Sequence, residues 1–182
     1  MAKPILRAAI AILSAIVLPL PATALAQDPR IPPTMDYADL AGPRLGITIL
    51  APELVDTLNA RGIDVGPVIS QFGWQFERIF YRSETGFSAM AEWIVLVGGL
   101  DQGAFLPSTS WIMGIRTRDG FEFGVGPNLS AGGFGLALAT GVTTRIGPLN
   151  VPINLAVVPS DFGVRTSVLV GFTMRSFGSN WW

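Results

Sequence analysis

The sequence contains no cysteine and no histidine, and these absences exclude much of the catalytic and metal chemistry that proteins use. Without cysteine there is no disulfide framework and no thiolate metal site. Without histidine, neither a Ser-His-Asp nor a Cys-His arrangement can be built, and the usual zinc ligands are missing. We therefore expect a protein that is not an enzyme and that uses no metal and no cofactor.

Charged residues are also scarce, at 14% of the chain, and lysine and arginine form no cluster. This excludes an electrostatic footprint for nucleic acid, so no nucleic-acid partner is expected. The mean hydropathy is nevertheless +0.48, which is high for an exported soluble protein. Past residue 26, no apolar run reaches the length of about 18 residues that marks a spanning helix. The longest candidate, residues 89–100, is interrupted by Glu92 and two glycines.

Residues 1–26 have the pattern of an export signal for the Sec pathway. A basic start precedes an apolar run over residues 8–20, and Ala24-Leu25-Ala26 is a small-x-small cleavage site. The run is shorter than the roughly 20 residues of a membrane-spanning helix, which favours a cleaved signal over a retained anchor. Residues 27–43 carry four prolines and no periodicity. They are predicted to form a flexible periplasmic lead-in, with a short plug as the alternative.

The rest of the chain is dominated by an alternation of period two. Between residues 120 and 174, large apolar residues occupy every second position, and glycine, alanine, serine, asparagine, glutamate or arginine stands between them. Such a pattern is typical of β-strands with one apolar face and one small or polar face. The pattern predicts eight strands, over residues 44–50, 66–81, 86–99, 105–117, 121–129, 133–145, 148–158 and 162–175.

An apolar chain that alternates in this way and has no spanning helix predicts a closed barrel. We expect an all-β fold over residues 44–182, an eight-stranded antiparallel up-and-down transmembrane β-barrel. One short helix is predicted over residues 52–61, in the first loop, because Pro52 suits the first helical position and Gly62 the stop. Its apolar face is expected to cap the barrel end rather than to bind a partner.

Alternation alone does not say which face of the barrel is wet. A soluble lipid-binding barrel would turn its aromatic residues inward around an apolar ligand. The surface of such a barrel would then consist mainly of glycine, alanine, serine and threonine, which is a poor soluble surface. We therefore expect a bacterial outer-membrane protein whose large side chains contact membrane lipid: Phe72, Trp74, Phe76, Trp93, Trp111, Phe121, Phe123, Phe134 and Phe172.

The same parity predicts a polar lumen. Its expected charge network has three residues of each sign: Glu77, Glu92, Arg116, Glu122, Arg145 and Arg165. Its expected polar residues are Gln71, Gln75, Asn128, Asn150 and Asn154. A three-residue hairpin at residues 118–120 would place Arg116 directly across from Glu122. Paired charges in a narrow lumen indicate a side-chain-filled barrel with a structural or interaction role, while the polar positions leave a narrow channel or small-ligand transporter open.

The export signal, the alternating strands, the short turns on one side and the aromatic C-terminal end resemble the small eight-stranded outer-membrane barrels of the OmpA and OmpX type. The resemblance covers residues 44–182 and is one of architecture. It implies a partner as well, because such barrels commonly end in an aromatic residue that the barrel-assembly machinery reads. Trp182 is similar to that residue.

Overall fold

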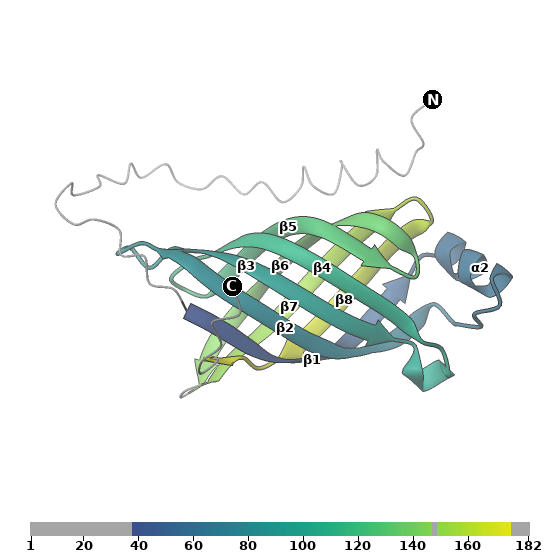
Figure 1. The fold of residues 1–182 in the computed structure, drawn as a ribbon, viewed down its shortest axis with the longest axis horizontal. Helices are drawn as coiled ribbons and strands as arrows, with labels where there is room; N and C mark the ends of the chain where they lie inside the picture. Colours follow the sequence, from purple (N-terminus) through teal and green to yellow (C-terminus); the bar gives the residue numbers. More distant parts are fainter. Residues whose placement is uncertain (1–37, 147–148, 176–182) are drawn as a thin grey trace, which may run out of the picture. The chain divides into compact units, whose positions relative to one another are not determined.

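The computed structural model describes residues 38–146 and 149–175 (Figure 1). The predicted export signal, most of the predicted lead-in and Trp182 lie outside the described residues. The elements are β1 (Ala38–Leu50), α2 (Pro52–Ala60), β2 (Val68–Arg82), β3 (Ser88–Gly98), η1 (Leu100–Gln102), β4 (Leu106–Arg116), β5 (Phe121–Ser130), β6 (Gly133–Ile146), β7 (Leu149–Ser160), β8 (Gly163–Gly171) and β9 (Met174–Arg175).

The strands form one antiparallel sheet that closes on itself. Each long strand pairs with the next along the chain, and β1 pairs with both β2 and β8. The two-residue β9 continues along β1 past the end of β8. Figure 1 shows the resulting barrel, with all strands tilted in the same sense. The predicted eight-stranded up-and-down barrel with one short helix after its first strand is confirmed.

The first strand begins earlier than predicted, so the predicted lead-in is wrong for residues 38–43. These residues pair with β2 from Ala38 opposite Ile79 to Pro43 opposite Trp74. Only one large apolar residue, Leu40, occurs in this segment, and Ala41-Gly42-Pro43 contains the residues that usually end a strand. The alternation is therefore invisible in the sequence, although the backbone continues the ladder.

Pro152 lies within β7. It pairs with Thr143 of β6, whereas the pairing of β7 with β8 begins one residue later, at Ile153. Proline has no N–H to donate, so it fits a strand only where one ladder is interrupted. The sheet resumes at an isolated bridge between Asn150 and Thr173.

The barrel carries its large apolar side chains on its outer face. All nine residues predicted to face lipid are exposed, from 43% for Trp74 to 66% for Phe134. Many of the alternate positions are buried; they include Arg44, Gln75 and Glu77, each at most 3% exposed, together with several apolar residues. The outer face is therefore apolar, as predicted, whereas the inner face holds both polar and apolar side chains.

One end of the barrel is closed by α2. Leu54 and Leu58 are the buried residues of this helix, and they pack with Leu50, Ile69 and Leu106 at the strand ends. This cluster confirms the predicted capping role. In Figure 1, α2 lies beyond the end of β1, at the same end of the barrel as η1.

The short η1 is tied to β2 by hydrogen bonds at this capped end. The Ser70 hydroxyl donates to Asp101 Oδ1 at 2.5 Å, and the Ser70 N–H donates to the same oxygen at 3.1 Å. These bonds hold the pKa of Asp101 below its ordinary value, because they stabilise the carboxylate form. Gln102 adds a bond from Nε2 to the Val68 carbonyl.

Close backbone approach makes Gly126 sensitive to substitution. A Cβ added there would lie 1.8 Å from the carbonyl oxygen of Trp111 on the adjacent β4. We expect Gly126→Ala to force β4 and β5 apart and to lower the free energy of unfolding by about 1–3 kcal/mol. Gly66→Ala is the control, because its nearest contact would be Gln102 Oε1 at 3.6 Å. Urea unfolding followed by tryptophan fluorescence measures both, and equal midpoints for the two variants would refute this prediction.

Candidate functional site

The lumen contains an ion-pair cluster centred on Arg116. Its Nη1 and Nη2 donate to the two carboxylate oxygens of Glu77 at 2.7 and 2.8 Å. Its Nε donates to Glu122 Oε1 at 2.5 Å. The predicted cross-strand pair of Arg116 with Glu122 is confirmed by the register of β4 and β5. The contact with Glu77 crosses the lumen from β2, since β2 and β4 are separated by β3 in the sheet.

Gln75 links two further charged residues, Arg44 and Glu92, which interact electrostatically with Glu77 and Glu122. Its Nε2 donates to Glu92 Oε1 at 2.6 Å, and its Oε1 accepts from Arg44 Nε at 2.7 Å. Asn154 extends the network on the other side by donating to Glu122 Oε2 at 3.1 Å. The cluster thus holds three carboxyl groups and two guanidinium groups. Gln75 joins β1, β2 and β3, and Arg116 joins β2, β4 and β5.

Arg44 was missed by the sequence analysis, although it is only 1% exposed. The predicted first strand started at this residue and its polar parity was not read. The signal was available, because Leu45, Ile47 and Ile49 alternate on the outer face and Arg44 has the opposite parity.

A second polar group lies nearer the capped end and is centred on Arg165. Its Nη2 donates to Asn128 Oδ1 at 2.7 Å, and its Nη1 donates to the Ser130 hydroxyl. Asn128 Nδ2 in turn donates to the hydroxyls of Ser108 and Ser110. Between the two groups, the hydroxyls of Thr48 and Ser167 are hydrogen-bonded to each other at 2.7 Å.

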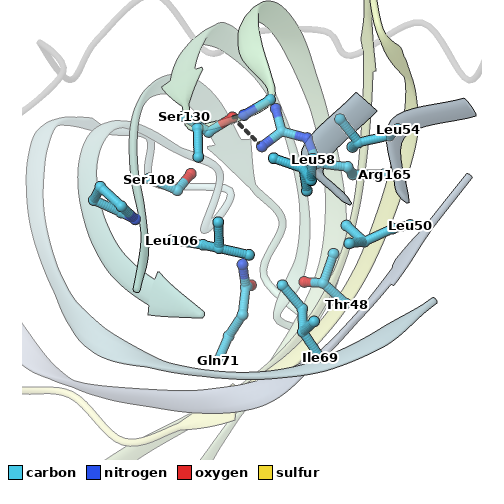
Figure 2. Close-up of a pocket in the computed structure, with 13 residues that line it drawn as sticks. Thr48, Leu50, Leu54, Leu58, Ile69, Gln71, Leu106, Ser108, Ser130 and Arg165 are labelled. Atoms are coloured by element: carbon cyan, nitrogen blue, oxygen red, sulfur yellow. Dashed lines mark hydrogen bonds between the residues drawn. The ribbon is translucent and has the colours of Figure 1, made fainter. Parts of the chain in front are cut away.

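A cavity of about 20 Å³ lies under α2, between the apolar cap and the Arg165 group (Figure 2). Leu54 and Leu58 line its apolar side, and Thr48, Gln71 and Arg165 are among its polar lining residues. Figure 2 shows the Arg165 side chain beside the two leucines, with its bond to Ser130 drawn. Gln71 reaches toward the same space from β2. The polar lumen therefore meets an apolar lid at this cavity.

The predicted lumen residues separate into three sets. The cluster around Arg116 brings together Glu77, Glu92, Arg116, Glu122, Gln75 and Asn154. Asn128, Arg165 and Gln71 belong to the capped end. The third set is Arg145 and Asn150, which lie at the opposite end of the barrel from the cap.

The placement of Arg145 in the lumen charge network is wrong. Arg145 has the inner parity but is exposed, because it lies one residue before the end of β6. Asn150 is half-buried and exchanges backbone hydrogen bonds with Thr173. Parity gives the face of a strand on which a residue lies, but not its depth along the barrel.

The arrangement favours a structural role for the lumen charges. Glu77 and Glu122 are both engaged by one guanidinium group, so neither carboxylate is free to act as a base or nucleophile.

Among residues 38–146 and 149–175, no group of three or more histidine, cysteine, aspartate or glutamate residues is arranged to hold a metal ion. No helix in these ranges is both long enough and apolar enough to cross a membrane.

Comparison with known proteins gives no relative that informs function. No family model matches the chain, and no curated protein matches it. Among solved structures, an acetoacetate decarboxylase-like enzyme from Sphingomonas wittichii RW1 is similar over 77% of this chain and 90% of its own, at 11% sequence identity and a TM-score of 0.20. A similarity this low carries no argument about the fold or the activity.

Proposed function

We propose that the protein is an outer-membrane β-barrel with a structural or interaction role and a lumen filled by side chains. The observation that carries this proposal is the inverted distribution of side chains. Trp111 and Phe134 are 60% and 66% exposed on the outer face, whereas Glu77 and Arg44 are 3% and 1% exposed inside. A water-soluble domain buries large apolar residues and leaves charges outside. A barrel in a bilayer places large apolar residues outside, against the lipid, and keeps charged residues inside.

The outer face supports this proposal along its whole circumference. Every long strand contributes exposed apolar residues, for example Ile47 on β1, Trp93 on β3 and Val168 on β8. Contiguous exposed apolar surface of this extent is unfavourable in water and marks an interaction surface. Lipid acyl chains would cover all sides of the barrel at once, as no single protein partner could.

The contents of the lumen favour a barrel filled by side chains over an open channel. Arg116, Glu77 and Glu122 join β4, β2 and β5 inside the lumen with bonds of 2.5–2.8 Å. The capped end is closed above them by Leu54 and Leu58 of α2. A soluble barrel that holds an apolar ligand is supported less well, because many of the inner positions carry charged and hydrogen-bonded side chains.

Membrane fractionation combined with gel mobility tests the location. We expect the protein to require detergent for extraction and to migrate differently before and after boiling, because a closed barrel resists detergent denaturation until it is heated. Omp-type barrels and periplasmic proteins of the same cells serve as markers for the two fractions. Complete recovery in a detergent-free periplasmic extract would make the soluble lipid-binding barrel the better interpretation.

Planar-bilayer recording tests whether the lumen is filled. The recording uses the folded protein that shows the heat-dependent change in gel mobility. We expect no stable open channel, because the Arg116 cluster and the α2 cap both lie across the conduction path. A variant that lacks residues 52–60 is the matched control, since it removes the cap and leaves the cluster. A large and regular conductance of the unmodified protein would contradict the structural role and favour the channel.

A further inference from the structure

Arg165 is a buried cation whose hydrogen-bond partners are all neutral. Its side chain is more than nine-tenths buried, at 8% exposure. It donates to Asn128 Oδ1 and to the Ser130 hydroxyl, and its Nε has no hydrogen-bond partner. An unpaired charge is costly to bury, so buried guanidinium groups are normally matched by an anion.

The carboxylates of the lumen do not provide this match. Within the described residues, the salt bridges of the barrel interior join Arg116 to Glu77 and Glu122 and leave Arg165 out. On β1, the partner of Arg165 is Leu50, and the charged cluster is reached six residues earlier, at Arg44. At about 3.3 Å per residue, these positions are roughly 20 Å apart along the strand.

The cavity beside Arg165 is lined by further groups that can donate hydrogen bonds. The Ser108 hydroxyl already accepts from Asn128, so its own hydrogen is free to donate. The paired hydroxyls of Thr48 and Ser167 share one bond and leave one further hydrogen. Gln71 is 9% exposed, and its Oε1 has no partner. Rotation of this amide about its last torsion would turn its NH₂ group to the cavity.

The cavity limits what can bind. Its volume of about 20 Å³ exceeds the roughly 10–15 Å³ that one water needs, but it is too small for an organic acid. A water would bond to the guanidinium group of Arg165 and leave its charge uncompensated. A monatomic anion would both bond to it and neutralise it.

We propose that the cavity under α2 is a binding site for one small inorganic anion of halide size, held by Arg165 with the hydroxyls of Thr48 and Ser108. The inference is independent of the membrane location proposed above, because it rests on the barrel interior alone. Leu54 and Leu58 form the apolar side of the site. The bound anion then links the polar lumen to the apolar cap.

Halide-dependent stability of the folded full chain in detergent tests the site. Thermal unfolding is compared in sodium chloride and in sodium gluconate at equal ionic strength, since gluconate exceeds the cavity. We expect a saturable stabilisation by chloride, with the ratio of folded to unfolded protein rising about 100-fold at 100 times the dissociation constant. Arg165→Gln is expected to lose this chloride dependence.

Arg145→Gln is the matched control, because it removes the same charge from an exposed strand end. It should keep the full chloride response, which separates the site from general screening. Equal responses of Arg165→Gln and Arg145→Gln, or no response of the unmodified protein, would overturn the proposal. If Arg165→Gln does not fold, bromide-soaked crystals of the unmodified protein decide: an anomalous peak beside Arg165 supports the site, and its absence overturns it.

Discussion

Replacement of Arg116 by leucine is expected to lower the free energy of unfolding by about 3–5 kcal/mol, the largest loss of stability among single changes in the lumen. Arg116 is the one group that bonds both Glu77 and Glu122, with distances of 2.5–2.8 Å. These carboxylates are 3% and 4% exposed, so removal of the guanidinium leaves both of them buried without their cationic partner. Urea unfolding in detergent, followed by tryptophan fluorescence, measures the loss.

Arg78→Leu is the control for this change. Arg78 Nε lies 3.7 Å from Asp39 Oδ1, and the side chains of this pair are 46% and 51% exposed. Exposed ion pairs contribute about 0–1 kcal/mol, so a small effect is expected. The Glu77→Gln change should recover part of the stability of Arg116→Leu, because an uncharged amide costs less to bury unpaired than a carboxylate. A loss for Arg116→Leu no larger than for Arg78→Leu would contradict the central role of Arg116.

The sequence predicted the faces of the strands well because parity is a local property. Once Phe121 and Phe123 are assigned to the outer face, Glu122 must point inward, whatever the rest of the chain does. The hairpin at residues 118–120 was short enough to fix the register between β4 and β5. The pair of Arg116 and Glu122 could therefore be predicted from residues six positions apart.

The contacts that cross the lumen could not be predicted in the same way. The bond of Arg116 to Glu77 joins residues 39 positions apart on strands that are not neighbours. Its existence depends on strand tilt and on the stagger of the closed sheet, which relate depth on one wall to depth on the other. The same missing information explains Arg145, whose inward parity was correct but whose position is beyond the network.

The α2 cap was also only partly predictable from the sequence. Pro52 and Gly62 mark its ends in the sequence, and its apolar face indicates that something must cover it. The chain does not say which strand ends would meet Leu54 and Leu58, because Leu50, Ile69 and Leu106 come from three different strands. The cavity and the unpartnered Nε of Arg165 follow from that packing and from no local motif.

Arginine at the middle of the outer face is expected to separate a membrane barrel from a soluble one. Val125 is the fifth of ten residues in β5, 45% exposed on the outer face. In a bilayer, Val125→Arg should cost about 2–4 kcal/mol, because the charge is placed near the midplane. In water, the same change at an exposed position should alter stability by no more than about 0.5 kcal/mol. Reversible urea unfolding in lipid bilayers, with the folded fraction read from the unboiled gel band, measures it.

Leu129→Arg on the same strand is the matched control. Leu129 is 58% exposed and lies one residue before the end of β5, where a long side chain can reach the interface. Its expected cost is about 0–1 kcal/mol. A difference between the two depths distinguishes membrane insertion from a general intolerance of β5 to arginine, because such an intolerance would affect both variants. A clear loss for Val125→Arg with little change for Leu129→Arg supports a bilayer around the barrel, whereas two small and equal effects would place its apolar face in another environment.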